Sequence, residues 1–215
     1  MRKSFHESLR DLKNDMLKMA SMVEDAINKS VKALKEGDMD LAQQVKDDDD
    51  AIDDMELILE EKCTKLIALQ QPVAKDLRMI IVISKLVTDL ERIGDHASNI
   101  ANVVLKIGDE PLIKPLIDIP RMTEIVTRRL RDTLDAFVNM DIELAKKVAR
   151  EDEEIDVIDE QILRELLTFM MEDPRTIRQA TYLMFISRFL ERIGDHSTNI
   201  CERIIYMVSG RREAY

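Results

Sequence analysis

Apolar residues recur at intervals of three and four along nearly the whole chain, the spacing that lines one face of an α-helix. From residue 5 to residue 35 this pattern predicts one amphipathic helix, which Gly37 ends. Asp38 suits the N-cap of a second helix, because its side chain can accept a hydrogen bond from the first turn. That helix is expected to extend to residue 70, and a third helix is expected to begin at Pro72.

The second and third predicted helices carry apolar residues at strict intervals of seven, a seam that requires a partner helix. The seam residues are Val45, Ile52, Leu59 and Leu66 on the second helix and Leu86, Ile93, Ile100 and Ile107 on the third. Helices with such faces and short connections pack as an antiparallel bundle. The first part of the chain is therefore predicted to be a three-helix bundle that ends at residue 108.

The rest of the chain repeats this unit. The hexapeptide Glu-Arg-Ile-Gly-Asp-His at 91–96 returns letter for letter at 191–196, and Asp141 repeats the cap position of Asp38. The seams return as Val148, Ile155, Ile162 and Phe169, followed by Ile186, Ile193, Ile200 and Met207. An identity of this length at a fixed offset indicates two copies of one unit.

Between the two copies lies a segment that cannot continue a helix. Residues 109–120 contain Pro111, Pro115 and Pro120, so this segment is predicted to be a linker. The sequence thus predicts an all-α fold of two tandem three-helix bundles related by an internal repeat. The first bundle is assigned to residues 1–108 and the second to residues 121–215.

Composition supports a helical fold and excludes several functions. Aromatic residues make up only 4% of the chain, and Gly and Pro number five each, which disfavours sheets. The formal charge of −11 argues against a nucleic-acid partner, since phosphate backbones are held by clustered Lys and Arg. Cys63 and Cys201 are isolated, so neither a zinc ribbon nor a disulfide framework is indicated. Charges in the first residues and the lack of a long apolar run predict a cytoplasmic, non-membrane protein.

Pairs of acidic residues four positions apart provide the candidate chemistry, because that spacing stacks two carboxylates on one helical face. The pairs are Asp49/Asp53, Glu91/Asp95, Asp152/Asp156 and Glu191/Asp195. Within each predicted hairpin, the two pairs lie at nearly equal distances from the turn, so antiparallel helices would bring them level. Four carboxylates at one level predict a cation site in each unit, and the alternative is a solvated acidic face.

These candidate ligands offer only oxygen, which favours hard divalent or trivalent ions. Mg, Mn, Ca or Fe are expected, singly or in multinuclear clusters, with Zn or Ni as alternatives. The helical angles place the sites in a groove or on an open face.

Further residues of the repeated motif are expected to support the ligands. Arg92 and Arg192 can pair with the nearby carboxylates, or bind an anion such as phosphate. His96 and His196 point away from the acidic stripe, so capping, packing or a supporting role is expected rather than ligation. The remaining supporting candidates are Asn99 and Asn199. The repeated Gly94 and Gly194 indicate the close approach of a backbone or an ion, or simply close helix packing.

The duplicated motif, the Pro72–Arg78 segment and the Asp89-Leu90 pair before the first motif resemble the PhoU family of phosphate transport accessory proteins. The resemblance covers essentially the whole chain. It implies a cytoplasmic, dimeric protein that binds multinuclear metal clusters through the four acidic pairs. It also implies negative regulation of the phosphate-starvation response, by linking the ATPase of the phosphate ABC transporter with a sensor histidine kinase. Asp89 is replaced by Phe189 in the second copy, so the two clusters could differ in nuclearity or affinity.

Two other classes of function compete with this non-enzymatic, metal-binding adaptor. Carboxylate-bridged metals on helical bundles also serve oxidases and phosphohydrolases, although the ferritin-like sites need Glu-x-x-His, which neither motif contains. A helical scaffold without metal is the third alternative. In that case, replacing Glu91 and Asp95 would leave both metal content and partner binding unchanged.

Overall fold

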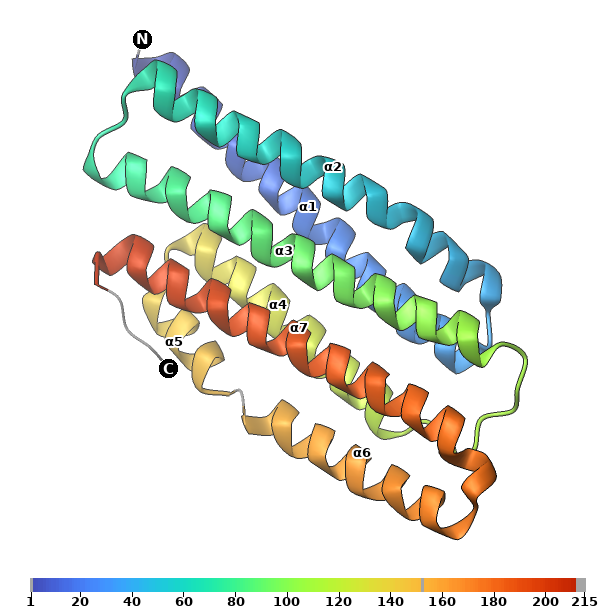
Figure 1. The fold of residues 1–215 in the computed structure, drawn as a ribbon. Coiled ribbons are helices and arrows are strands. Elements are labelled where there is room, and N and C mark those ends of the chain that lie inside the picture. The colour runs from blue at the N-terminus through green and yellow to red at the C-terminus, as the bar shows by residue number, and fades with distance from the viewer. Residues whose placement is uncertain (1, 152, 212–215) are drawn as a thin grey trace.

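The computed structural model describes residues 2–151 and 153–211, and within them all regular structure is helical (Figure 1). The helices are α1 (Arg2–Glu36), α2 (Met39–Gln70), α3 (Ala74–Ile107), α4 (Asp118–Asn139), α5 (Ile142–Arg150), α6 (Glu153–Glu172) and α7 (Ile177–Ser209). A single turn of 3-10 helix, Pro174–Thr176, precedes α7. The predicted all-α class is confirmed.

Two bundles lie side by side, and one helix of each forms the contact between them. Helices α1, α2 and α3 form the first bundle, and α4 to α7 form the second. Helix α3 packs along α7 through the middle of the molecule, while α2 and α6 lie on opposite outer edges (Figure 1). The acidic motif helices of both repeats are therefore the two central helices.

The seam residues form the core that sets this arrangement. All eight predicted seam positions of α2 and α3 are buried, as are seven of the eight in the second repeat. Phe169 is the exception and is half-buried. Burying such side chains contributes roughly 1.5–3 kcal/mol each to folding, so the seams fix which helix faces meet.

Two aspartates end the short turns as predicted. The Oδ1 atom of Asp38 accepts a hydrogen bond from the amide of Leu41 at 2.9 Å, and Asp141 caps α5 through Leu144 at 3.0 Å. Both caps satisfy an amide of the first turn that has no partner within the helix.

The second repeat departs from the predicted pattern in one helix. The seam from Val148 to Phe169 predicted one continuous helix, but α5 ends at Arg150 and α6 begins at Glu153. At the end of α5, the buried Arg129 donates from Nη2 to the backbone oxygen of Val148 at 3.2 Å. The same oxygen accepts from the amide of Glu151 at 3.2 Å, in the last turn of the helix.

The start of α3 also differs from the prediction, since α3 begins at Ala74 rather than at Pro72. Gln71 takes a left-handed conformation with φ of 46° and ends α2. The chain then needs the residues up to Val73, which has an extended backbone, to reverse its direction.

Close packing accounts for the repeated glycines. A Cβ atom on Gly94 would lie 3.2 Å from the Ile52 side chain of α2. A Cβ atom on Gly194 would lie 2.8 Å from Ile155 of α6. Both glycines let the neighbouring helix approach closely at the level of the acidic pairs.

No helix in the described ranges is both long enough and apolar enough to cross a membrane. The outer surface nevertheless shows large apolar side chains. The most exposed of these on α2 and α6 are Leu57, Leu69, Val157 and Met171.

We expect Asp38→Ala to lower the free energy of unfolding by about 1 kcal/mol, because the first turn of α2 loses its cap. Asp38→Asn keeps a capping oxygen and should leave stability almost unchanged. Urea unfolding followed by circular dichroism measures both. Equal losses in the two variants would contradict the capping role and point to the charge instead.

Candidate metal centre

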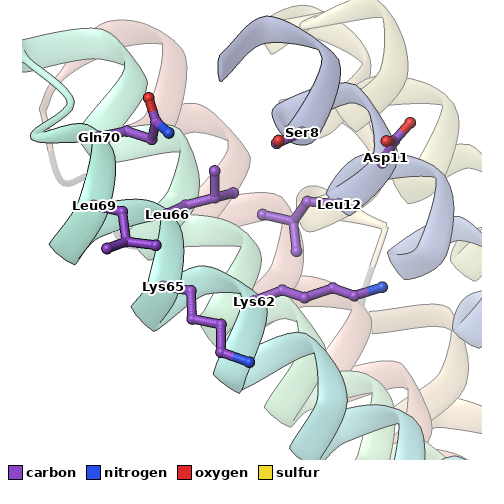
Figure 2. A pocket seen from close by; sticks show the side chains of 8 residues that line it. All are labelled: Ser8, Asp11, Leu12, Lys62, Lys65, Leu66, Leu69 and Gln70. Carbon is purple, nitrogen blue, oxygen red and sulfur yellow. The ribbon is translucent and has the colours of Figure 1, made fainter. Parts of the chain in front are cut away.

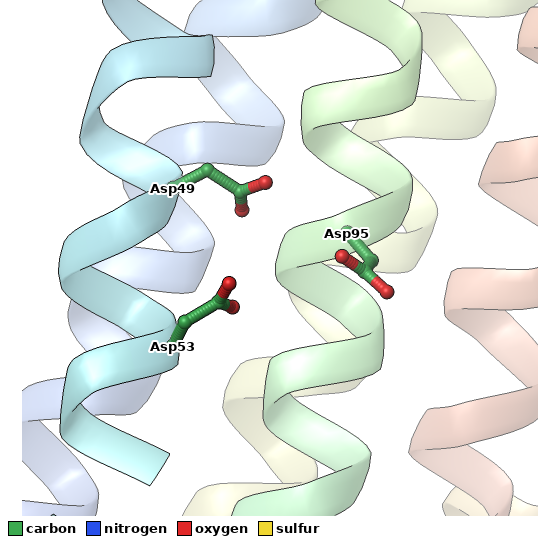
Figure 3. Close-up of side chains that lie close together, drawn as sticks. All are labelled: Asp49, Asp53 and Asp95. Carbon is green, nitrogen blue, oxygen red and sulfur yellow. The ribbon is translucent and has the colours of Figure 1, made fainter. Parts of the chain in front are cut away.

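Helices α2 and α3 bring three carboxylates together in the first repeat. Asp49 and Asp53 project from α2 toward Asp95 of α3 (Figure 3), and one oxygen from each lies within 4.8 Å of the others. Three of the four acids that were predicted to lie at one height in this hairpin therefore do meet. The heptad seams produce it, because Ile52 lies between the two aspartates in sequence and packs on Gly94.

The three carboxylates form an open-sided site. Asp49 is half-buried and Asp53 is exposed, while 37% of the Asp95 side chain is accessible. Burial raises the pKa of Asp49, with Asp53 and Asp95 adding to the effect, although a hydrogen bond from Ser98 opposes it. Burial and then Asp95 raise the pKa of Asp53. The site disfavours its own negative charge, which a bound cation would relieve.

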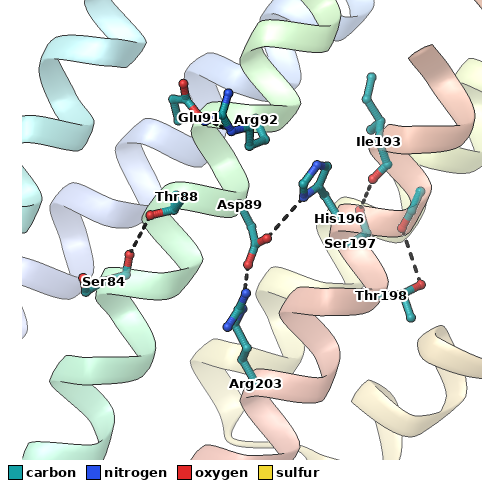
Figure 4. A network of polar contacts seen from close by, with 11 residues as sticks. Ser84, Thr88, Asp89, Glu91, Arg92, Ile193, His196, Ser197, Thr198 and Arg203 are labelled. Carbon is teal, nitrogen blue, oxygen red and sulfur yellow. Dashed lines mark hydrogen bonds and ion pairs between the residues drawn. The ribbon is translucent and has the colours of Figure 1, made fainter. Parts of the chain in front are cut away.

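Glu91 is influenced by the charges of Asp95 and Asp53, and its side chain is more buried than that of Asp95. Its pKa is raised to about 7, first by burial and then by Asp95. Arg92 lies 3.3 Å from Glu91 Oε2 (Figure 4). It also donates to Asp95 at 3.0 Å. The buried Oε2 atom of Glu91 still has no partner with hydrogen-bond geometry.

Glu56 is an additional acid of this site that the sequence pattern did not single out. It lies on α2 and raises the pKa of Glu91, and its own pKa is raised by burial despite a hydrogen bond from Thr88. Its position three residues after Asp53 continues the same helical stripe. The sequence signal for it is a stripe of acids over three successive helical turns, at positions 49, 53 and 56.

The second repeat gathers a corresponding set of acids on α6 and α7. Glu191 is only 8% exposed, and its pKa is raised to about 7, first by burial and then by Asp195. Asp156 and Asp159 raise it further. Asp159 corresponds to Glu56 in the first repeat. The remaining predicted ligand, Asp152, lies outside the residues that the structure describes.

Arginine pairing differs between the repeats. In the first, Arg92 pairs with Asp95, as predicted. In the second, Arg188 donates to Glu191 Oε1 at 2.8 Å and lies 3.8 Å from Asp159, while Arg192 is exposed. The spacing of three between Arg188 and Glu191 would have indicated this pair. The two asparagines expected to support the ligands, Asn99 and Asn199, are both exposed.

The two histidines of the motif meet between the bundles instead of beside the acids. The rings of His96 and His196 lie 5.7 Å apart, and His96 stacks on Phe189 at 5.8 Å. Burial and then His196 lower the pKa of His96 to about 4, so its ring is neutral at pH 7. Both histidines therefore pack between α3 and α7.

Asp89 joins this contact from the other side. It is 5% exposed, and its two oxygens reach His196 Nδ1 at 3.2 Å and Arg203 Nε at 2.6 Å (Figure 4). Asp89 and Phe189 occupy matching positions of the repeat, and each faces the histidine of the other bundle. Their difference thus belongs to the contact between the bundles, and not to the metal ligands.

A separate groove lies between α1 and α2 (Figure 2). It encloses about 330 Å³ and is lined by Leu12, Leu66 and Leu69, with Lys62 and Lys65 at its edge. Its mixed, open lining does not resemble the acidic cluster, which faces α3.

The donor chemistry of the acidic clusters fits hard metal ions. Asp49, Asp53 and Asp95 offer carboxylate oxygens from two rigid helices, with Glu91 and Glu56 adjacent. Among the described residues, Glu91 and Glu191 each carry a buried oxygen without a hydrogen-bond partner. Ions such as Mg²⁺ and Mn²⁺ prefer such oxygen ligands, so these residues could hold a metal.

The chain matches the PhoU domain family twice, over residues 16–104 and 119–204. It is 44% identical over 204 residues to the phosphate-specific transport system accessory protein PhoU homolog of Aquifex aeolicus, covering 95% of this chain and 92% of that protein. These matches cover both bundles described above.

Two crystal structures show the same fold. PhoU from Pseudomonas aeruginosa superimposes with a TM-score of 0.92 at 41% identity, covering 96% of this chain and all of that one. The phosphate transport system regulatory protein PhoU from Streptococcus pneumoniae gives 0.91 at 31% identity, covering 98% of this chain and all of that one. These relatives are accessory and regulatory proteins rather than enzymes. Both repeats match the family, and the fold is the same. The chain therefore belongs to the PhoU family of accessory proteins of phosphate-specific transport.

Proposed function

We propose that this chain is a metal-binding regulator in which the acidic cluster between α2 and α3 holds one or more divalent or trivalent cations. The observation that carries the proposal is the convergence of Asp49, Asp53 and Asp95 within 4.8 Å. Carboxylates this close repel each other unless a cation or a proton lies among them. Magnesium, manganese and iron suit the oxygen donors, and zinc or nickel could replace them. The second cluster, with Glu191 and Asp195, is proposed as a related site.

The proposed regulatory role is that of an adaptor between the ATPase of the phosphate ABC transporter and the sensor histidine kinase. Its effect is negative regulation of the phosphate-starvation response. Family membership supports it, since the relatives are described as accessory and regulatory proteins of phosphate transport. The formal charge of −11 suits basic protein surfaces as partners. We further propose that the chain acts in the cytoplasm as a homodimer and reaches membranes only through these complexes.

Removing two ligands should abolish tight metal binding. We expect Asp53→Asn/Asp95→Asn to weaken Mn²⁺ binding on the order of 100-fold or more, since even changes outside the ligand shell cost about 10–100-fold. Calorimetric titration and elemental analysis of protein purified without chelator measure the effect.

A control variant, Asp40→Asn/Glu61→Gln, removes the same charge from exposed positions of α2 and should bind Mn²⁺ normally. Identical metal content in all three proteins would favour the metal-free scaffold.

The raised pKa values of Glu91 and Glu191 predict that the metal-free protein loses stability as pH rises. Their folded-state values of about 7 lie above the ordinary 4.5, so the folded state binds more protons within this window. The free energy of unfolding must then fall between about pH 5 and pH 8. Urea unfolding with a chelator present measures it.

The variant Glu91→Gln/Glu191→Gln should show a smaller fall, because these two acids no longer titrate. Excess Mn²⁺ should restore wild-type stability at the higher pH, since it binds the folded state. An equal fall between pH 5 and pH 8 in the chelated wild type and in the double variant would contradict the prediction.

The adaptor role predicts metal-dependent capture of both partners. We expect the immobilised full chain to retain the transporter ATPase and the kinase in the presence of Mn²⁺ and phosphate. Capture should decrease with a chelator or with Asp53→Asn/Asp95→Asn, because uncompensated carboxylates alter the charge of that face. Pull-down with the purified partners measures it. If neither partner is retained in phosphate-rich, metal-replete buffer, the adaptor role is wrong.

A further inference from the structure

Arg129 is a permanent positive charge inside the second bundle. It lies on α4, is 1% exposed, and is among the largest fully buried side chains of the described residues. The position that matches it in the first repeat, 103 residues earlier on α1, is Ala26. Because a guanidinium remains protonated in proteins, the two repeats differ here by a whole internal charge.

The guanidinium of Arg129 reaches the acidic motif helix of its own bundle. Its Nη2 donates to Thr198 Oγ1 of α7 at 3.0 Å. Its Nη1 lies 3.8 Å from the point where a Cβ atom on Gly194 would stand. Gly194 lies between the proposed ligands Glu191 and Asp195 on α7, so the positive charge contacts the helix that carries them.

A carboxylate takes the corresponding place in the first repeat. A Cβ atom on Gly94 would lie 3.6 Å from Asp49 Oδ1, and Ser98 donates a hydrogen bond to the same Asp49. Gly94 and Ser98 match Gly194 and Thr198 through the offset of 100 residues. Among the described residues, the contact beside this glycine is thus a cationic group in the second repeat and a proposed metal ligand in the first.

From this exchange we propose that Arg129 is a built-in counter-cation of the second cluster. The first cluster is then the tight metal site, and the second binds metal only weakly. This inference rests on the proposed metal-binding function. The guanidinium repels an incoming metal ion, because like charges inside a bundle are poorly screened.

The break between α5 and α6 supports the same conclusion independently of charge. Arg129 also holds the Val148 carbonyl at 3.2 Å, near the C-terminus of α5. In the first repeat, the matching stretch of α2 is continuous and presents Asp49 and Asp53 on successive turns. In the described residues of the second repeat, the corresponding stretch is divided between α5, which ends at Arg150, and α6, which begins at Glu153.

Calorimetric titration with Mn²⁺ of the full chain and of Arg129→Met tests this inference. Methionine fills similar volume without charge, so the bundle can keep its packing. We expect the wild type to show one tight class of site and the variant to gain a second class. The gained class should bind at least about tenfold more tightly than the second cluster of the wild type, because one buried unit charge outweighs a tenfold step in affinity.

Arg128→Met is the matched control, because it removes the exposed neighbouring arginine of α4. It should leave the titration unchanged. The gained class should disappear when Asp156→Asn/Asp195→Asn is added to Arg129→Met. If folded Arg129→Met, checked by circular dichroism, binds Mn²⁺ as the wild type does, the inference is overturned.

Two further variants test the inference with Arg129 intact. Asp53→Asn/Asp95→Asn should lose the tight class, whereas Asp156→Asn/Asp195→Asn should keep it. Equal losses in both would overturn the inference while leaving metal binding in place. No tight class in the wild type, together with no effect of either pair, would instead refute the proposed function.

Discussion

The register between α2 and α3 is the constraint on which the candidate site depends. Side chains buried at every seventh position fix how the two helices lie against each other, and Ile52 packs on Gly94 within this seam. Asp49 and Asp53 flank Ile52, while Asp95 follows Gly94, so the apolar contact determines where the carboxylates meet. A displacement by one helical turn, 5.4 Å, would separate them. The core thus positions the ligands without any attraction among the ligands themselves.

Bringing these acids together works against the stability of the metal-free fold. The pKa values of Glu91 and Glu191 reach about 7 because burial and neighbouring carboxylates disfavour their charged forms. A protein that keeps such groups needs a compensating contact, which a metal ion, a proton or an arginine can provide. Arg92 in the first repeat and Arg188 in the second provide part of it.

Divergence between the repeats is concentrated where the helices meet. Asp89 and Phe189 occupy matching positions, yet one forms an ion pair with Arg203 and the other stacks on His96. The contact between α3 and α7 thus combines one polar and one aromatic half, which a pair of identical repeats could not make. The interiors differ as well, because the second bundle has the buried Arg129 at the position where the first has Ala26. Two copies that share the motif letter for letter therefore surround it differently.

The sequence alone determined the helical class, the two repeats, the caps at Asp38 and Asp141, and the three acids that meet between α2 and α3. Periodicity, turn chemistry and register are local or nearly local properties, so they can be read along the chain. Only the tertiary structure decided that the motif histidines pack between the bundles, and that the buried Arg129 bonds the carbonyl of Val148 on a neighbouring helix. Contacts of this kind join residues far apart in sequence, so no spacing along the chain encodes them. They arise because a buried polar group must take whichever partner the packed helices bring within reach.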